Sequence, residues 1–181
     1  IALSRDAVSL GLAGAEFADI QADSITITCD LADRADIAAA AEQIKAKTGW
    51  IAGIVHNAGI ISPIKSMAEV DRANWARNIQ INLVGVQDLT NRLISVMGGK
   101  QQSRVTTISS GASLRAVSGW SAYCVAKAGL DMWAKCLAEE GTESNISAIS
   151  IAPGIVDTDM QKTIRSSNEN DFPDHKTFVE L

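Results

Sequence analysis

Tyr123 and Lys127 stand four positions apart in the segment SAYCVAKAGL, which otherwise has the composition of a buried helix. Residues at i and i+4 of a helix project from one face, about one turn apart. A free tyrosine titrates near pH 10, and a neighbouring ammonium group lowers the pKa because it favours the phenolate. The pair therefore suits proton transfer, with the phenol as acid or base.

Two further polar residues can join this pair. Ser110 precedes Tyr123 by thirteen residues, a loop long enough for both hydroxyls to meet one substrate oxygen. A carbonyl held by two hydroxyls is polarised for hydride attack, and tyrosine can donate the proton that the new alkoxide needs. Asn82, within INLVG, interrupts an apolar helical face and could hold a water that links Lys127 to solvent. Taken alone, each residue is more often an ordinary turn, core or surface residue, but together they indicate carbonyl reduction.

The chain must supply strands and helices to position these groups. β-branched runs alternate with apolar residues at helical spacing, which predicts an α/β fold with a doubly wound parallel sheet and helices on both faces. The strands are apolar nearly throughout, as burial on both faces demands. The predicted strands cover 1–4, 25–29, 51–56, 104–109 and 146–152, and the predicted helical tracts cover 6–17, 33–47, 66–97 and 121–140.

Helix signals refine these boundaries. Ser66 with Glu69 has the spacing of a capping box, and Asp33 or Asp30 can cap the helix after the second strand. Towards the C-terminus the apolar pattern dissolves, and the polar segment 161–181 predicts a flexible substrate loop.

Small or polar residues follow every predicted strand. Ligands of open parallel sheets bind outside the carboxyl ends of the strands. The sequence therefore predicts that the segments after the strands line one rim around a ligand. These segments are Ser4-Arg5, Asp30, Asn57-Ala58-Gly59, Ser109-Ser110-Gly111 and Pro153-Gly154.

Composition excludes several classes of protein. The chain has 181 residues, 46% of them hydrophobic, and a net charge of −5 without a basic stripe, which fits one globular domain and argues against nucleic acid as a partner. Cys29, Cys124 and Cys136 lack the spacing of a disulfide framework or a metal site. Because no apolar run is long enough to span a bilayer, a cytoplasmic protein without a membrane partner is the default expectation.

Five motifs in a fixed order resemble those of the short-chain dehydrogenase/reductase family, over about residues 1–160. They are HNAG at 56–59, NLVG at 82–85, ISS at 108–110, YCVAK at 123–127 and PGIVDT at 153–158. The resemblance implies a Rossmann-like fold in which Tyr123 is the acid/base and Lys127 holds the cofactor ribose and tunes the tyrosine. It also implies that Ser110 orients the carbonyl and Asn82 completes the proton relay. His56 replaces the asparagine that usually opens the first motif.

Arg5 favours NADP(H) as the cofactor. The strand that ends there lies beside the adenosine ribose in this fold, where a carboxylate selects NAD and an arginine accommodates the 2′-phosphate of NADP. Asp6 follows closely and could merely cap the next helix. By resemblance, the other cofactor-binding residues are Asp30 and Leu31 at the adenine, Asn57, Ala58 and Gly59 at the adenosine ribose, and Pro153, Gly154, Ile155 and Thr158 at the nicotinamide, together with Tyr123 and Lys127.

The glycine-rich turn that binds the pyrophosphate in this family does not occur in the 181 residues. We therefore expect residues 1–181 to be a single domain that is incomplete at both ends, without the first strand-helix unit and the C-terminal strand. A sheet without its central first strand would contain a wide apolar gap.

The segment IAPGIVDTDMQKTIR resembles the sepiapterin reductase and benzil reductase branch, which implies a small ketone, diketone or α-hydroxyketone as substrate. Trp120 and Met160 could line the substrate pocket or simply pack a loop. The leading hypothesis is an NADPH-dependent carbonyl reductase, and the alternatives are a non-catalytic NADP-binding sensor or a degraded enzyme without its phosphate loop. The apolar helix 121–140 suggests a homodimer or homotetramer.

Overall fold

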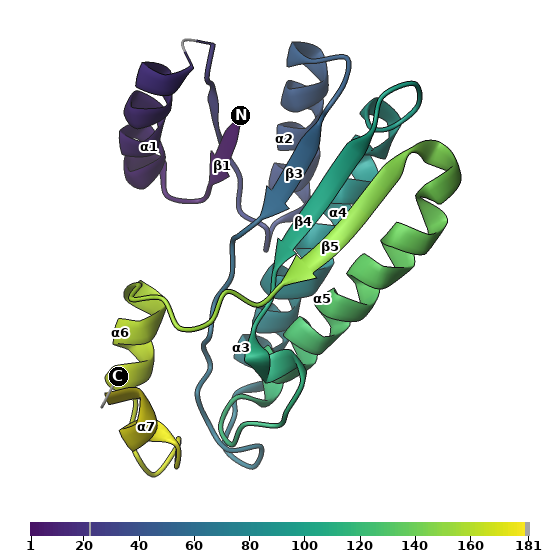
Figure 1. Cartoon of the computed structure of the whole chain (residues 1–181). Coiled ribbons are helices and arrows are strands. Elements are labelled where there is room, and N and C mark those ends of the chain that lie inside the picture. Colours follow the sequence, from purple (N-terminus) through teal and green to yellow (C-terminus); the bar gives the residue numbers. More distant parts are fainter. Residues whose placement is uncertain (22, 180–181) are drawn as a thin grey trace.

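The computed structural model describes residues 1–21 and 23–179, and five parallel strands form its centre (Figure 1). All five predicted strands are confirmed, each with slightly different ends. The strands are β1 (Ala2–Ser4), β2 (Thr26–Thr28), β3 (Gly53–His56), β4 (Ser103–Ile108) and β5 (Ile146–Ile151). The helices are α1 (Ala7–Ile20), α2 (Arg34–Lys47), α3 (Arg72–Ile79), α4 (Gly85–Leu93), α5 (Ser121–Glu140), α6 (Asp159–Arg165) and α7 (His175–Val179).

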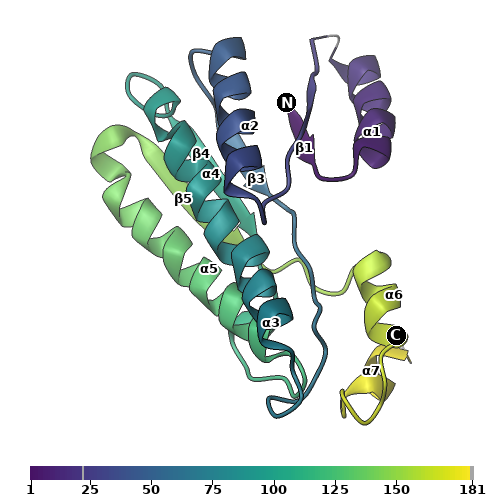
Figure 2. The ribbon, with the colours of Figure 1, turned by 180° about the vertical axis from the view of Figure 1, so that it is seen from behind.

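Helices α2, α4 and α5 lie side by side on one face of the sheet β3-β4-β5, as both views show (Figures 1 and 2). The register of β4 on its neighbours places Val105 and Thr107, both fully buried, on that face. The other face carries Val55, Ile149 and Ile151, which are exposed. The predicted parallel sheet with flanking helices is confirmed, whereas burial on both faces is wrong for this sheet within the described residues.

The strands form two sheets rather than one. β1 pairs with β2, and β3, β4 and β5 pair in that order, but no described residue pairs with the facing edges of β1 and β3. A cavity of about 950 Å³ lies there, with Leu3, Ile51 and Ile54 among the apolar residues of its wall. It corresponds to the apolar gap that the sequence predicted beside the central strands.

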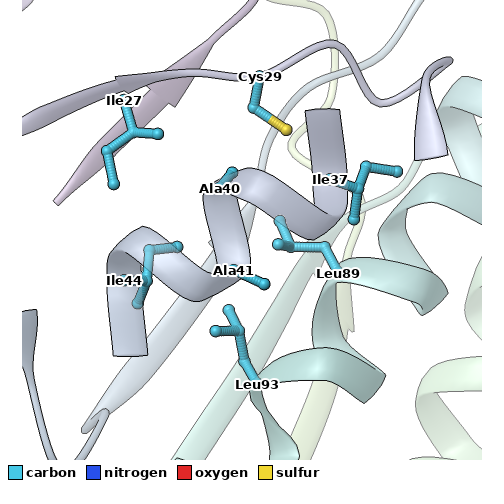
Figure 3. Packing of buried hydrophobic residues seen from close by; sticks show 8 residues of the cluster. All are labelled: Ile27, Cys29, Ile37, Ala40, Ala41, Ile44, Leu89 and Leu93. Carbon is cyan, nitrogen blue, oxygen red and sulfur yellow. The ribbon is translucent and has the colours of Figure 1, made fainter. Parts of the chain in front are cut away.

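The main core forms where α2 packs between β2 and α4. Ile37, Ala40, Ala41 and Ile44 recur at helical spacing on one face of α2 and are buried. Figure 3 shows them pointing at Ile27 and Cys29 on one side and at Leu89 and Leu93 of α4 on the other. Asp33 begins the helix as predicted, since its Oδ1 accepts from the backbone N–H of Ala35 at 2.7 Å.

The predicted helical tract 66–97 is shorter and broken. The capping box at Ser66 is wrong, because α3 begins at Arg72 and Asp71 caps it by accepting from the N–H of Asn74 at 2.8 Å. One turn of π-helix, Gln80–Val84, then separates α3 from α4. Such turns often mark functional sites in helices, and this one contains Asn82.

The C-terminal segment is more ordered in secondary structure than its polar composition predicted. It contains α6 and α7, which lie on the side to which the strands point (Figure 1). We call residues 166–174, which join these helices, the strap. Phe172 of the strap has no exposed surface, and Asp171 pairs with Lys65 at 2.7 Å. Mobility of 161–181 stays a prediction, and residues 180–181 lie outside the described residues.

The strap rests directly on Gly119. A Cβ at this position would lie 2.4 Å from the carbonyl oxygen of Asp171, and the residue has a φ of +82°, which side chains other than glycine rarely adopt. Gly119 also accepts from the backbone N–H of Lys65 at 2.9 Å. The segment before α5, the loop after β3 and the strap therefore meet at this glycine.

Gly85 sets how closely α4 approaches the end of β2. A Cβ there would lie 2.3 Å from the carbonyl oxygen of Leu31. We expect Gly85→Ala to lower the free energy of unfolding by about 2–3 kcal/mol, because the backbone of Leu31 must move away. Denaturant unfolding followed by circular dichroism measures this change.

Gly11→Ala is the matched control. Gly11 lies within α1 and has no atom within 4 Å of its would-be Cβ. Alanine there should raise stability by about 0.5–1 kcal/mol through helix propensity alone. Equal effects of the two substitutions would contradict the assigned contact at Gly85.

Candidate active site

Lys127 lies at the meeting point of α5, the end of β4 and the turn after β3. Its side chain is only 4% exposed, and its Nζ donates to the carbonyl oxygen of Ile108 at 2.7 Å. The same Nζ lies 5.6 Å from the centre of the Tyr123 ring. A Cβ at Gly59 would lie 3.5 Å from this Nζ and 3.0 Å from Asn82 Oδ1. The ammonium, the asparagine and the turn after β3 therefore lie together.

Tyr123 and Ser110 bring their hydroxyls together, as the sequence predicted. Tyr123 is 5% exposed, and the Ser110 hydroxyl is near enough to its phenol to act on the pKa of Tyr123. Ser110 follows β4 and begins a short 3₁₀ turn, where its Oγ accepts from the N–H of Ala112 at 3.2 Å. Two hydroxyls and an ammonium thus converge at the carboxyl end of β4.

Asn82 lies in the π-helical turn and is fully buried. Its Oδ1 accepts from the N–H of Ile60 at 2.9 Å, and its Nδ2 donates to the carbonyl of Ile60 at 2.8 Å and to Asn78 Oδ1 at 2.7 Å. Both hydrogens of this amide have protein acceptors, while its oxygen keeps a second lone pair, so the expectation that it holds a water stays a prediction. Its observed contacts fix the loop after β3 beside Lys127.

Asn78 was missed by the sequence analysis. Its Nδ2 lies within hydrogen-bond distance of the carbonyl oxygens of Ile60, Ile61 and Ser62, at 3.1, 3.3 and 2.8 Å. The signal was present as a second asparagine four residues before Asn82, on the same helix face. The two amides together anchor the segment that carries Gly59.

The predicted lowering of the Tyr123 pKa is wrong for the protein alone. Burial raises the pKa of Tyr123, and the hydrogen bond from Ser110 opposes this only in part. Burial also lowers the pKa of Lys127 to about 8, against the attraction of Asp131. Both groups are thus shifted towards their neutral forms, because neither is well hydrated.

The predicted adenosine-side residues lie together. Arg5, Asp30, Leu31, Asn57, Ala58 and Gly59 all line the 950 Å³ cavity, at the carboxyl ends of β1, β2 and β3. Asp6 serves as a helix cap, the alternative that the sequence left open, because its Oδ1 accepts from the N–H of Val8 at 3.1 Å. This rim carries polar and charged side chains, whereas the wall between the sheets carries apolar residues such as Leu3 and Ile54.

The predicted nicotinamide-side residues lie apart from that rim. Pro153, Gly154, Ile155 and Thr158 follow β5, are exposed, and are not among the cavity-lining residues. Within the described residues, the predicted cofactor-binding residues of the rim therefore form two separate halves. One half lines the cavity, and the other follows β5. Gly59 connects the halves, because it lines the cavity and also lies against Lys127 and Asn82.

An aromatic cluster packs against Tyr123. Trp120 contacts the Tyr123 ring edge-on with centroids 5.9 Å apart, and stacks on Phe172 of the strap at 4.9 Å. Phe178 of α7 completes the cluster, and Met160 packs on its edge. The sequence indicated Trp120 and Met160 but missed both phenylalanines, because each stands alone in a polar segment.

The described residues contain no group of three side chains suited to bind a metal ion. Nor does any helix in the described part of the chain have the length and apolarity to cross a bilayer.

Replacing Lys127 with methionine should stabilise the fold at neutral pH. The buried ammonium titrates near 8 in the folded protein and near 10.5 when unfolded, a difference worth about 3 kcal/mol. Subtracting about 1 kcal/mol for the lost hydrogen bond to Ile108 leaves a gain of about 2 kcal/mol. The gain should be full below pH 8 and shrink between pH 8 and 10.5, as the folded protein loses its proton first.

Denaturant unfolding at several pH values measures this gain. Lys100→Met removes an exposed ammonium and should show no such pH-dependent gain. A stability difference for Lys127→Met that stays constant across the range would contradict the assigned titration.

Comparison with known proteins gives the family. Residues 1–169 match the family model described as short chain dehydrogenase. The chain is 39% identical over 134 residues to the benzil reductase ((S)-benzoin forming) of Bacillus subtilis, covering 71% of this chain and 54% of that protein. It is 36% identical over 143 residues to the benzil reductase IRC24 of Saccharomyces cerevisiae, covering 76% and 54%.

The solved structures agree with the sequence matches. The crystal structure of the KRED1-Pglu enzyme matches with a TM-score of 0.85 at 32% identity, over 99% of this chain and 73% of that one. The chain spans about half the length of the curated relatives it matches. Because the family match extends over most of the sequence and the fold agrees, the chain belongs to the short-chain dehydrogenase family, in a benzil reductase-like branch.

Proposed function

We propose that the whole protein is an NADPH-dependent reductase of small ketones, diketones or α-hydroxyketones. One observation carries this proposal: the buried phenol of Tyr123 lies beside the Ser110 hydroxyl and one helical turn from the buried ammonium of Lys127. Binding a nucleotide requires neither hydroxyl, whereas reducing a carbonyl requires a proton donor beside an oxygen-binding group.

Ser110, Tyr123 and Lys127 have different roles in the proposed reduction. Ser110 and Tyr123 donate hydrogen bonds to the substrate carbonyl oxygen, which makes its carbon more electrophilic. The bound nicotinamide supplies the hydride that adds to this carbon. Tyr123 then transfers its proton to the oxygen, so that the products are an alcohol and a phenolate. Lys127 stabilises this phenolate electrostatically and returns a proton to it.

The direction of the pKa shifts suits reduction. Because burial raises the pKa of Tyr123, the phenol carries its proton at neutral pH and is ready to act as an acid. Because the pKa of Lys127 is about 8, its ammonium can release and regain a proton near neutral pH.

The fit of the dinucleotide rests on the rim and on Gly59. Arg5 lines the cavity at the end of β1, which supports a contact of its guanidinium with the 2′-phosphate, and the missing Cβ of Gly59 would let the other half of the cofactor approach Lys127 closely. Lys127 would hold the nicotinamide ribose, and the residues after β5, from Pro153 to Thr158, would hold the carboxamide. The cofactor would thus bridge the two halves of the rim.

The substrate class follows from the aromatic cluster and the relatives. Trp120, Met160 and Phe172 form an apolar wall next to the Tyr123 ring. The two benzil reductases that the chain resembles act, by name, on a diketone with two phenyl groups. Benzil is therefore the first substrate to test.

Subunit association is part of the proposal. Val125 and Met132 lie on the outward side of α5 and are exposed. A second copy packed on this side would bury them, which favours a homodimer or homotetramer.

Tyr123→Phe should abolish almost all turnover and leave NADPH binding intact, because only the proton donor is removed. NADPH absorbance with benzil measures turnover, and nicotinamide fluorescence measures binding. Full activity of this variant would refute the assignment. A wild-type protein that binds NADPH but reduces no member of a diketone panel would favour the sensor alternative.

Arg5→Ala should weaken NADPH binding about tenfold and leave NADH binding unchanged, since a charge-assisted hydrogen bond contributes about 1.5–3 kcal/mol. Fluorescence titration with each cofactor compares the dissociation constants. Equal losses for NADPH and NADH would contradict recognition of the 2′-phosphate by Arg5.

A further inference from the structure

Asp131 lies one helical turn beyond Lys127, so that Tyr123, Lys127 and Asp131 form a row along the inner face of α5. Its half-buried carboxylate faces β5, where the Oγ of Ser150 donates to Oδ1 at 2.5 Å. The hydroxyl of Thr107 on β4, which is fully buried, donates in turn to Ser150 at 2.9 Å. A chain of hydroxyls from two strands therefore ends on this carboxylate.

The direction of this chain fixes the charge at its end. Each hydroxyl has one hydrogen, and both hydrogens point towards Asp131, which can then only accept. Such chains strengthen the final hydrogen bond. Burial acts against ionisation of Asp131, but the hydrogen bonds that the carboxylate accepts, including that from Ser150, and the attraction of Lys135 hold the pKa of the carboxyl below its usual value. Asp131 is therefore negatively charged at neutral pH.

The other groups that face Lys127, from α5 itself and from the elements packed against it, are neutral. They are the phenol of Tyr123, the carbonyl of Ile108 and the amide of Asn82 near the turn at Gly59. Among the described residues, Asp131 is the charged group that acts on the ammonium. On its other side, Asp131 faces Lys135 of the same helix. Lys127 donates its hydrogen bond to Ile108 and not to Asp131. Asp131 therefore acts on the ammonium by electrostatic attraction across one helical turn.

We propose that Asp131 is a positioning residue that keeps the buried side chain of Lys127 in its ammonium form, and so extends the pH range over which the protein binds NADPH and reduces carbonyls. The inference rests on the proposed role of Lys127 in cofactor binding and proton return. A purely structural role, in which Asp131 only fastens α5 to β5, would not depend on the charge of Lys127.

The test compares Asp131→Asn with the wild type in NADPH binding and in kcat/KM for benzil across the pH range. Loss of the carboxylate should move the pH at which Lys127 deprotonates down by about one unit. Binding and kcat/KM should then be unchanged near pH 6 and reduced about fivefold near pH 8. Glu139→Gln, which removes an exposed carboxylate from the same helix, should match the wild type at both pH values.

Asp131→Glu should restore the wild-type profile, since it restores the charge. A loss of equal size at every pH, or no loss at all, would overturn the proposal, because either result would mean that Asp131 does not control the charge of Lys127.

A second measurement needs no catalysis. A double-mutant cycle of Asp131→Asn and Lys127→Met, followed by denaturant unfolding, isolates the coupling between the two residues. The coupling should be present near pH 7 and lost near pH 10, where Lys127 is neutral. Coupling that is absent or independent of pH would overturn the inference. If the wild type consumes no NADPH with any carbonyl, the proposed function fails, and the cycle still decides the role of Asp131.

Discussion

An ammonium group removed from water destabilises a fold by several kcal/mol unless other groups replace its hydration. Lys127 is in this position, and three features of the fold replace part of that hydration. The end of β4 provides the carbonyl of Ile108, α5 provides the face of the Tyr123 ring, and the carboxylate of Asp131 lies one turn away. These contacts and apolar packing together hold α5 against the face of β4 and β5.

The same burial determines the chemistry of the neighbouring phenol. A tyrosine on the surface would exchange its proton with water, whereas Tyr123 is buried beside the Ser110 hydroxyl and the ammonium of Lys127. Stability and reactivity are therefore opposed at this site: the groups that make proton transfer efficient are those that the fold would be more stable without. The cluster around Trp120 supplies the apolar packing that lets the site persist.

Sequence patterns predicted the parts of the fold that depend on local periodicity. Helix α5 begins and ends at the predicted residues, and the approach of Tyr123, Lys127 and Ser110 follows from one helical turn and one strand end. The π-helical turn at Asn82 could not be predicted in this way, because it depends on bonds to Ile60, twenty-two residues away. The rise in the pKa of Tyr123 likewise depends on burial by the distant Phe172 and Phe178.

Gly119 determines how closely the strap can pack over the aromatic cluster beside Tyr123. The peptide of Asp171 lies against its α-carbon with room for a hydrogen atom and nothing larger. Any side chain at this position would push the strap outwards and move Phe172 away from Trp120. The distance between the strap and the aromatic cluster beside Tyr123 is thus determined at Gly119, four residues before Tyr123. The hydrogen atom on this α-carbon takes no part in the proposed reaction.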